Sequence, residues 1–395
     1  MMKKIIIANT VLLLLTAVAV QAQKQMPGRD RYPMAKLAAK YPVKYTDGND
    51  GWNADSLGNY RAVVRYKKGQ FTKGKVYNGY LVRVVINWRR HDSAIDRKRI
   101  IVEDAQTHKR VPNLPVNLTN DNVGAVYFHA ISGTGTYYVY YMPYKNEGRS
   151  NYPRGTYLLP DTTFTWQQQH AKGPNFFVDT ATCTEIQYIN TFNSPYPMEV
   201  VANKDEVQQL VDKYKPTPFL IFPENREHSI RLKDYLPYRW IQAGAFKSFT
   251  DSADKGEFFT LQLGVYALQD LQNVKVQFTD LKGPRGAAIN AKDITCINTT
   301  GIAYDGKPLT NIVNVAKDKV QALWCGMQIP TGIPAGIYKG TATVSTDGAT
   351  SKNVNVSIVV NNKQAFNGNI GEPEKMTRLH WLNSTMAQEN TVIAP

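Results

Sequence analysis

The sequence predicts a mainly β protein with two antiparallel β-sandwich domains joined by a mixed α/β connector. Three observations support this fold class. Apolar and polar residues alternate in a series of short segments, an Asp-Gly turn separates two of these segments, and helical periodicity is rare between them. Tyr (23) outnumbers Phe (14), and 27 Gly and 21 Pro supply turn residues, as is typical of β-rich chains.

The clearest predicted element is a hairpin within residues 330–360. One face of segment 337–345 and one face of segment 351–360 carry apolar or small residues. Asp347-Gly348 lies between the two segments, and this dipeptide is a strong hairpin signal. An isolated hairpin is only marginally stable in water, so we expect its apolar face to pack on a second sheet.

The first sandwich domain is expected over residues 28–150. Its strands are predicted at residues 60–66, 76–88, 99–104, 124–130 and 136–142. The last of these contains four tyrosines, which we expect on both faces of the strand: Tyr137, Tyr138, Tyr140 and Tyr141. A ring that reaches the surface can stack on a sugar, whereas the alternative is packing in the core and at its rim.

Residues 151–249 are expected to form the mixed connector. Strands are predicted at residues 185–189 and 219–222. A helix is predicted at 204–214, where Asn203 can cap the first turn and Glu206 is placed to complete a capping box. Pro216 follows the helix and ends it.

The second sandwich domain is expected over residues 250–362. Its strands are predicted at residues 256–265, 274–278, 293–298 and 321–329, followed by the hairpin. Residues 363–395 are predicted to form a linker and then a helix that begins at Pro373. An apolar stripe on this helix predicts a downstream domain that covers it.

Residues 1–22 are typical of a secretory signal peptide. Lys3 and Lys4 precede an apolar run, and small side chains place the cleavage site after Ala22. The alternative is an N-terminal membrane anchor, but the apolar run is short for a spanning helix. We therefore expect a periplasmic or extracellular protein with no membrane span once the signal peptide is removed.

The chain is basic, with a formal net charge of +15 at pH 7. This charge favours acidic partners, such as sulfated or uronic-acid glycans, although it can also serve only to maintain solubility. Nucleic acid is a poor fit to an exported chain. One basic group clusters around a predicted turn: Arg89, Arg90, His91, Arg97, Lys98 and Arg99. It could contact anions, or it could form a solvated hairpin end that prevents edge-to-edge pairing.

Three cysteines are an odd number for an oxidising compartment. Cys296 and Cys325 fall in predicted strands of one domain, so a disulfide can join them. The alternative is that these two and Cys183 are separate buried thiols that behave as small core residues.

No cofactor and no metal site are expected. The six His are scattered without zinc-ligand spacing. Loop 46–59 is rich in side-chain oxygens, which could bind calcium, but it lacks EF-hand spacing and also fits an ordinary turn cluster. The oxygen-bearing residues considered are Asp47, Asn49, Asp50 and Asp55.

The polar segment 223–228 and Asp234 are the candidate for catalysis. Glycoside hydrolysis normally needs two carboxyl groups on opposite sides of a sugar, and Glu224 and Glu227 are neighbours in one loop. Arg226 and His228 are expected to pair with these glutamates in a structural ion network. No other catalytic motif is present, so no catalytic residue is assigned and the carbohydrate-binding residues stay unknown.

Several segments resemble the exported bacterial proteins of the glycoside hydrolase family 123 type. They are residues 136–144, 196–200, 222–228, 236–240, 256–264, 333–340 and 377–384. The resemblance implies β-sandwich regions that precede a (β/α)-barrel, which removes N-acetylgalactosamine with assistance from the substrate and an adjacent acidic pair. No matching acidic pair is found here, so no catalytic residue is carried over.

Three functional hypotheses follow. The first is a non-catalytic N-terminal portion of a glycan-processing protein, which presents, orients or shields a missing C-terminal catalytic region. The second is a glycosidase that acts through the region from Glu224 to Asp234. The third is a surface adhesion or scaffold protein without a role in sugar chemistry.

Overall fold

The computed structural model describes residues 44–49, 51–68, 80–92, 97–114, 117–120, 123–148, 151, 154–161, 179–302, 307–369, 372 and 375. The signal peptide expected at 1–22 lies outside these residues, as does the helix expected from Pro373, apart from Lys375. The described chain is mainly β and contains several sheets, which confirms the predicted fold class.

The contacts divide the chain into two compact units. Unit 1 comprises Met1–Trp88 and Asp92–Pro195, and unit 2 comprises Arg89–His91 and Tyr196–Pro395. The boundary therefore falls inside the stretch 151–249 that was expected to be a connector. The predicted domain boundaries stay a prediction, and the two units are described separately below.

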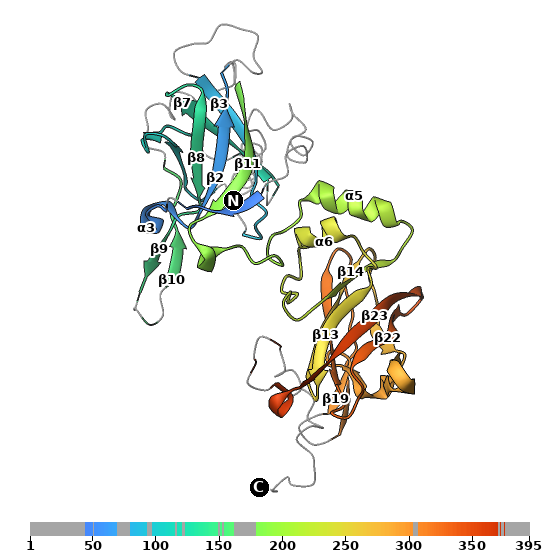
Figure 1. Cartoon of the computed structure of the whole chain (residues 1–395). Helices are drawn as coiled ribbons and strands as arrows, with labels where there is room; N and C mark the ends of the chain where they lie inside the picture. Colours follow the sequence, from blue (N-terminus) through green and yellow to red (C-terminus); the bar gives the residue numbers. More distant parts are fainter. Residues whose placement is uncertain are drawn as a thin grey trace, which may run out of the picture. The chain divides into compact units, whose positions relative to one another are not determined.

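The regular elements described in unit 1 are mostly strands (Figure 1). They are β1 (Lys44–Asp47), β2 (Tyr60–Tyr66), β3 (Tyr80–Asn87), β4 (Ile100–Asp104), β5 (Arg110–Val111), β6 (Asn117–Asn120), β7 (Val123–Ala130), β8 (Gly135–Tyr141), β9 (Tyr144–Glu147), β10 (Arg154–Tyr157) and β11 (Asp179–Tyr188). Helix α3 (Ala54–Leu57) precedes β2, and the 3-10 helix η2 (Thr191–Asn193) follows β11.

Strand β11 joins the two halves of the unit 1 sheet. Residues 179–181 pair in parallel with β3, and residues 182–188 pair antiparallel with β2 across a bulge between Cys183 and Glu185. On one side of β11 lie β2, β8, β4 and β5, and on the other lie β3, β7 and β6. Their inward residues share one core, to which β2 contributes Val64 and β3 contributes Val84, so the two halves form facing layers.

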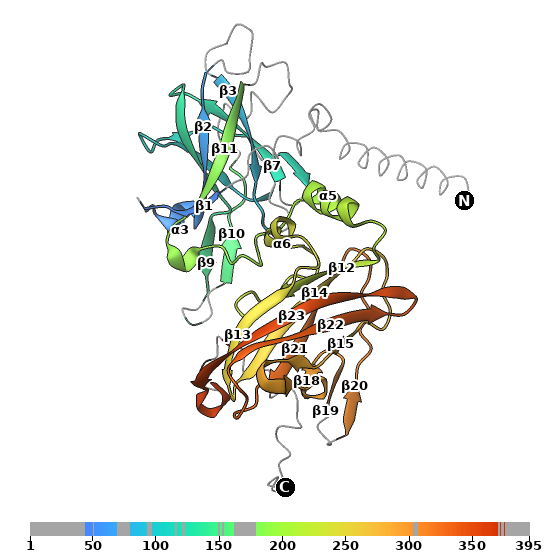
Figure 2. The same cartoon turned by 45° about the vertical axis from the view of Figure 1, so that its right-hand side comes forward.

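The described residues of unit 2 form longer strands and two α-helices. Figure 2 shows this unit from a second direction. The helices are α5 (Lys204–Tyr214) and α6 (Tyr238–Ala243). The strands are β12 (Phe219–Glu224), β13 (Phe249–Lys255), β14 (Phe258–Ala267), β15 (Lys275–Phe278), β16 (Leu281–Lys282), β17 (Ala288–Ile289), β18 (Ile294–Cys296), β19 (Thr300–Ile302), β20 (Pro308–Thr310), β21 (Val320–Gln328), β22 (Gly336–Thr346) and β23 (Ala349–Gln364). Three 3-10 helices lie between or after them: η3 (Pro284–Gly286), η4 (Ala291–Asp293) and η5 (Phe366–Asn369).

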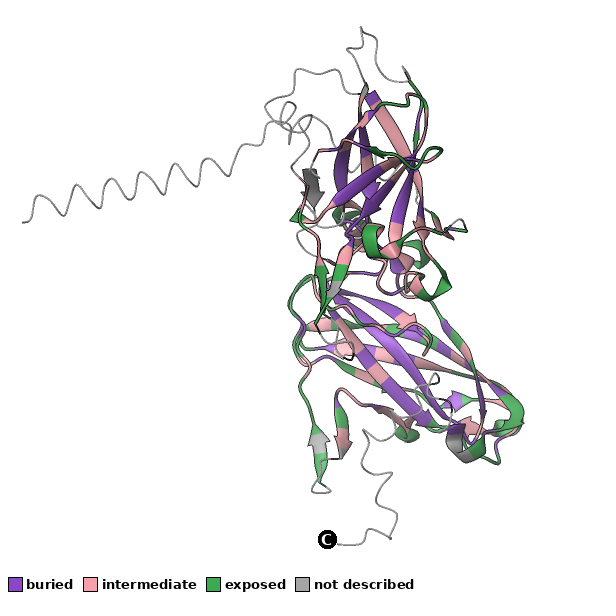
Figure 3. Cartoon of the chain, turned by 90° about the vertical axis from the view of Figure 1, so that its left-hand side faces the viewer, coloured by how far each residue is buried: buried purple, intermediate pink, exposed green. Residues whose placement is uncertain are grey.

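The central layer of unit 2 is the sheet with strand order β12-β14-β21-β18. One of its faces packs on the sheet that contains β13, β23 and β22, through residues such as Leu261 and Val356. Its other face packs on α5 and α6, through residues such as Phe222 and Trp240. Strand β14 is buried along its whole length, with an apolar face toward β13, β22 and β23 and an opposite face that includes the polar Thr260 and Gln262. Figure 3 colours the buried residues purple.

The predicted hairpin is confirmed by β22 and β23. Thr346 pairs with Ala349 across the predicted turn, and Gly348 has a φ of 70°, a value that favours glycine. Tyr338 and the alternating valines of β23 face the core, so the expected second sheet is present. Strand β23 continues to Gln364, which is past the expected domain end at 362.

The expectation of purely antiparallel sheets is wrong in detail. Strand β11 pairs in parallel with β1 and β3, and β13 pairs in parallel with β23. Sequence alternation does not distinguish parallel from antiparallel partners, because both arrangements alternate side chains between the two faces of a sheet. Only the long connections between these strands hint at parallel pairing.

The predicted helix at 204–214 is confirmed as α5. The Asn203 side chain accepts a hydrogen bond from the Glu206 N–H at 2.9 Å, and the Glu206 carboxylate accepts one from the Asn203 N–H at 2.9 Å. This reciprocal pair is the capping box predicted from the sequence. Leu210 is buried on the face that meets the central sheet, so packing adds to the capping energy.

Candidate functional site

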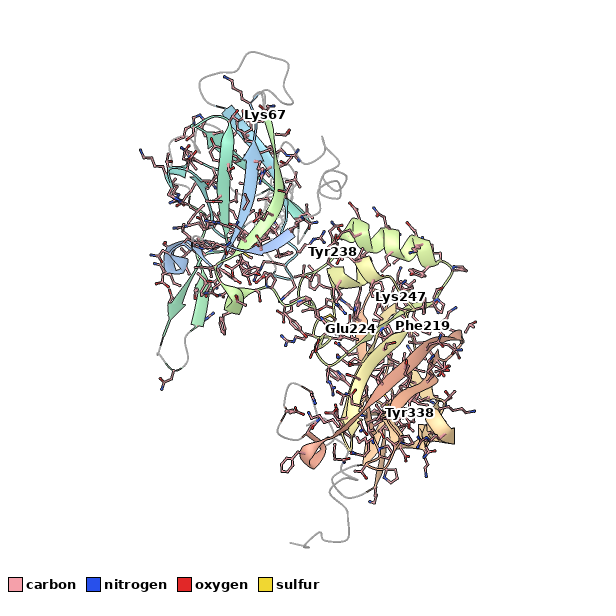
Figure 4. All side chains as sticks on the ribbon, viewed as in Figure 1. Lys67, Phe219, Glu224, Tyr238, Lys247 and Tyr338 are labelled. Carbon is pink, nitrogen blue, oxygen red and sulfur yellow. The ribbon has the colours of Figure 1, made fainter. Side chains whose placement is uncertain are left out.

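Glu224 ends strand β12, and the alternation of that strand decides which way it faces (Figure 4). Phe219 and Ile221 point into the core between the sheets, whereas Leu220 and Phe222 point toward the helices. Glu224 shares the face of the latter pair, because side chains two residues apart lie on the same side of a strand. A carboxylate is thereby placed in a largely apolar layer, where it is 3% exposed.

Both oxygens of Glu224 are occupied by donors from α6. Arg239 donates from Nε to Oε1 at 2.8 Å and from Nη2 to Oε2 at 3.0 Å. Trp240 donates from Nε1 to Oε1 at 2.7 Å, and its ring stacks on Phe222 with centroids 4.4 Å apart. Burial of a charge is tolerated when it is paired and hydrogen-bonded, and these three bonds meet that condition. Glu224 thus anchors α6 to β12.

The other groups of the candidate segment lie in different surroundings. Burial lowers the pKa of His228, and the charge of Arg239 lowers it further. His228 lies 3.9 Å from Glu224 through Nδ1, which also contacts the Asn225 side chain at 2.8 Å. Glu227 is exposed. The segment therefore does not supply a second buried carboxyl group opposite Glu224.

Asp234 does not join this group either. Its carboxylate accepts a hydrogen bond from the Lys319 ammonium at 2.6 Å, and this bond lowers the pKa of Asp234. Both side chains are largely exposed, so the pair is a surface ion pair of little energetic weight.

Arg226 has a different partner from the one expected. Its guanidinium forms an ion pair with Glu257, which is fully buried, and it donates to the Ser252 carbonyl at 3.2 Å. The second oxygen of Glu257 accepts the Asp254 N–H at 2.8 Å. The expected pairing of Arg226 with Glu224 or Glu227 is thus wrong, because the turn before β14 brings Glu257 to this arginine.

Asp254 is a further buried carboxylate that sequence reasoning missed. Burial alone would raise the pKa of Asp254, but a hydrogen bond from Asn361 and the charges of Lys363 and Lys375 lower it overall. Lys363 lies 3.4 Å and Lys375 lies 3.6 Å from its Oδ2. Asp254 is the last but one residue of β13, a strand whose residues alternate weakly, so its sequence context carries no signal of this role.

Arg89, the first residue of the basic cluster, is buried and paired rather than exposed to an external anion. Its guanidinium forms two hydrogen bonds to the Glu206 carboxylate, at 2.8 and 2.7 Å, and lies 3.5 Å from the centre of the Tyr238 ring. Its side chain is 2% exposed. Lys98 lies over the Tyr157 ring in unit 1 instead. The capping glutamate of α5 thus also neutralises a buried arginine.

Unit 1 presents a second candidate surface, here named the aromatic face: Trp52, Arg61, Glu103, Tyr138 and Tyr140. The registers of β2, β4 and β8 place the last four on the outer side of the sheet, away from the core. The prediction that tyrosines occupy both faces of β8 is confirmed, because Tyr137 and Tyr141 belong to the core while Tyr138 and Tyr140 do not.

Arg61 is the centre of the aromatic face and is 1% exposed. Its guanidinium lies 3.6 Å from the centre of the Tyr138 ring and 4.4 Å from that of Trp52. It donates from Nε to Gln187 Oε1 at 2.7 Å and from Nη1 to the Tyr140 hydroxyl at 3.3 Å. Stacking and hydrogen bonds together hold this charge. Tyr138 is half-buried, whereas Tyr140 is fully covered, so Tyr138 is the tyrosine of β8 that a ligand can reach.

The aromatic face does not provide a glycosidase acid pair. Glu103 and Glu185 lie in one register row, separated by Tyr138 on β8 and Val63 on β2. Three strand spacings put their Cα atoms about 14 Å apart, which is well beyond the separation that either glycosidase geometry uses. Burial raises the pKa of Glu103, whereas a hydrogen bond from Thr46 lowers that of Glu185.

Within the described residues, no three His, Cys, Asp or Glu side chains converge on a point where a metal could bind. Of the oxygen-rich loop, Asp50 lies outside those residues, and Asp55 belongs to the first turn of α3. Among the described helices, none has the length and apolar character needed to span a bilayer.

Comparison with known proteins gives an independent indication of the family. Residues 50–189 match the family described as glycoside hydrolase 123, N-terminal domain. The chain contains a glycoside hydrolase 123-like N-terminal region. This region includes the whole aromatic face, and the resemblance noted in the sequence is confirmed over that part of the chain.

Two solved structures match parts of this chain at low identity. A family 123 glycoside hydrolase from Clostridium perfringens, studied for glycolipid glycan hydrolysis, is 16% identical over 38% of this chain and 28% of its own, with a TM-score of 0.30. MyfA, the major subunit of Myf fimbriae from Yersinia enterocolitica, is 12% identical over 29% of this chain and 96% of its own, with a TM-score of 0.22. The chain therefore spans about a quarter of the length of the family 123 enzyme. A search of curated proteins found no match.

Proposed function

We propose that the chain is a non-catalytic N-terminal portion of an exported, glycan-processing protein of the glycoside hydrolase 123 type. In this proposal it presents or orients a downstream catalytic region. The match of residues 50–189 to an N-terminal domain of that family supports the placement. The non-catalytic role is supported mainly by Glu224, the buried carboxylate of the candidate segment. Both of its oxygens already accept hydrogen bonds from Arg239 and Trp240.

We also propose that unit 1 contacts glycan weakly through the aromatic face. Tyr138 offers a half-buried ring, and Trp52 is likewise partly accessible. Aromatic rings bind the apolar faces of sugars, and the neighbouring polar groups can hydrogen-bond to hydroxyls. The net charge of +15 favours acidic glycans over neutral ones.

The test is a glycan array followed by calorimetric titration with the purified chain. Tyr138→Ala should weaken binding about 3- to 10-fold, because it removes one stacking contact. Tyr127→Ala is the matched control, since Tyr127 is a half-buried tyrosine on β7, outside the aromatic face. Equal loss in both variants would refute the aromatic face as the contact. No binding to any glycan would favour an adhesion or scaffold role without sugar chemistry.

Export is tested separately by fractionation of cells and N-terminal sequencing of the mature protein. The proposal expects the protein outside the cytoplasm, with a new N-terminus directly after Ala22. Full-length protein in the cytoplasm would contradict it.

A further inference from the structure

Two thiols of unit 2 lie directly opposite each other in the central sheet. Cys296 ends the edge strand β18, and its Cα partner on β21 is Cys325. Cys296 is 5% exposed and Cys325 is 0% exposed, and both belong to the core between the two sheets. In the structure both are free thiols.

The hydrogen bonds around the pair show which type of cross-strand site it occupies. The next residue, Ile297, donates its N–H to the Trp324 carbonyl at 2.9 Å, so these two form a hydrogen-bonded pair. Hydrogen-bonded and non-hydrogen-bonded pairs alternate along an antiparallel ladder. Cys296 and Cys325 are therefore a non-hydrogen-bonded pair, whose Cα atoms are typically about 4.5 Å apart. That separation is within the range a disulfide spans, at its short end.

The two thiols lie opposite each other across the ladder, and each shifts the pKa of the other. In the reduced form the Cys325 thiol donates a hydrogen bond to the Leu323 carbonyl at 3.9 Å. The third cysteine of the chain is not a competitor within this unit. Cys183 lies in unit 1, where it is buried in β11 with its Sγ 3.7 Å from the Glu185 carbonyl. The sheet register thus pairs two cysteines and leaves the third alone.

We propose that Cys296 and Cys325 are an oxidisable pair that closes into a cross-strand disulfide when the protein meets a disulfide oxidant. The oxidant class is a small-molecule disulfide or the disulfide of a thiol oxidoreductase. The thiolate of Cys296 attacks a sulfur of the oxidant, one thiol leaves, and a mixed disulfide forms. Cys325 then loses its proton and attacks Cys296, which releases the second thiol. Two electrons and two protons have passed to the oxidant.

The surroundings favour Cys296 as the attacking sulfur. Interaction with the neighbouring Cys325 thiol, and then with Thr299, lowers the pKa of Cys296 to about 7, whereas the pKa of Cys325 is raised well above its ordinary value. A thiol with a pKa near neutrality is the better nucleophile under mild conditions. Access comes from local opening of β18, which has three residues and lies at the edge of its sheet.

The disulfide would fasten an edge strand to a central one. It closes the loop from 297 to 324, which contains β19 and β20, and this cross-link restricts the unfolded chain. Thiol–disulfide exchange runs in both directions, so a reducing thiol can reopen the bond. Cys296 and Cys325 would therefore form a reversible cross-link between β18 and β21 of unit 2.

The experiment compares the full chain after incubation with oxidised glutathione and after dithiothreitol. Each sample is denatured and alkylated with N-ethylmaleimide, and the mass of the intact protein is then measured by mass spectrometry to count the labels. The reduced chain should carry three labels, and the oxidised chain should carry one label, on Cys183. The oxidised form should melt about 5 to 10 °C higher than the reduced form.

Cysteine variants test whether Cys296 and Cys325 cause the rise in melting temperature on oxidation. Cys325→Ala should remove the oxidant-dependent rise in melting temperature, and Cys183→Ser should keep it and leave no label after oxidation. Three labels after oxidation would overturn the proposal, as would a lasting glutathione adduct on Cys296 in the unaltered chain. Loss of the effect in Cys183→Ser alone would also overturn it. If Cys325→Ala does not fold, the label counts of the unaltered chain still decide the question.

Discussion

Replacing Glu224 by Gln distinguishes a structural carboxylate from a catalytic one through the sign of the change in stability. A catalytic carboxylate is commonly held at a cost to the fold, so its neutralisation often stabilises the protein. Glu224 has the opposite environment, because both of its oxygens accept hydrogen bonds in a buried layer. We therefore expect Glu224→Gln to destabilise unit 2.

The magnitude follows from the bonds that glutamine can keep. Its amide oxygen can still accept from Trp240 Nε1 and Arg239 Nε, but its NH₂ group would face the Nη2 donor of Arg239. Loss of one charge-assisted hydrogen bond costs about 1.5–3 kcal/mol. The Arg239 side chain is 40% exposed and can turn to water, so the lower half of that range is expected. For a unit of this size, the melting temperature should fall by roughly 3–6 °C.

The assay is thermal unfolding by calorimetry, with urea unfolding as a second measure. Glu227→Gln is the matched control, because Glu227 is exposed and its neutralisation should change stability by less than about 0.5 kcal/mol. A Glu224→Gln protein that is as stable as the unaltered chain, or more stable, would refute the structural role of Glu224.

Three further predictions follow from the packing and charges of unit 2. Gly264→Ala should lower the free energy of unfolding in urea by about 1–3 kcal/mol, because the new Cβ would lie 2.4 Å from the Trp240 ring. Gly332→Ala is the control and should leave this free energy nearly unchanged, because its new Cβ meets nothing within 4 Å. Arg89→Met should lower the free energy of unfolding in urea by about 3–5 kcal/mol, because it leaves the Glu206 carboxylate that caps α5 without its guanidinium partner. A loss below about 1 kcal/mol would contradict the importance of that ion pair. The pKa of Asp254 is lower in the folded state, so the ionised carboxylate adds to the free energy of unfolding above the unfolded pKa of about 3.9, and this addition is lost as the pH falls through the folded pKa. The difference in free energy of unfolding between the unaltered chain and Asp254→Asn should therefore shrink below about pH 4. A difference that stays constant with pH would contradict this prediction.

Local patterns were sufficient to predict several elements of the fold. The hairpin of β22 and β23 follows from alternation and a turn dipeptide, and α5 follows from its capping residues. Both signals lie within a few residues of the element they specify. The parallel pairings of β11 and β13 were not predicted, because they depend on which distant strands meet.

At the candidate site, too, the sequence predicted features of neighbouring residues but not contacts between residues that are distant in the chain. The segment around Glu224 was recognised from its charge, but its partner Arg239 lies 15 residues away on another element. Arg226 was assigned to the wrong glutamate, since Glu257 is distant in sequence and adjacent in the fold. Arg61 was not singled out at all, because a lone arginine in an alternating strand gives no sign that two rings will enclose it.

Hydrolysis of an aryl N-acetylgalactosaminide by the purified chain tests the non-catalytic role most directly. We predict no release of the aryl group above the rate in buffer, because Glu224 is bonded to Arg239 and Trp240 while Glu227 is exposed. Release that is abolished by Glu224→Gln or Glu227→Gln, in a protein that remains folded, would contradict the account.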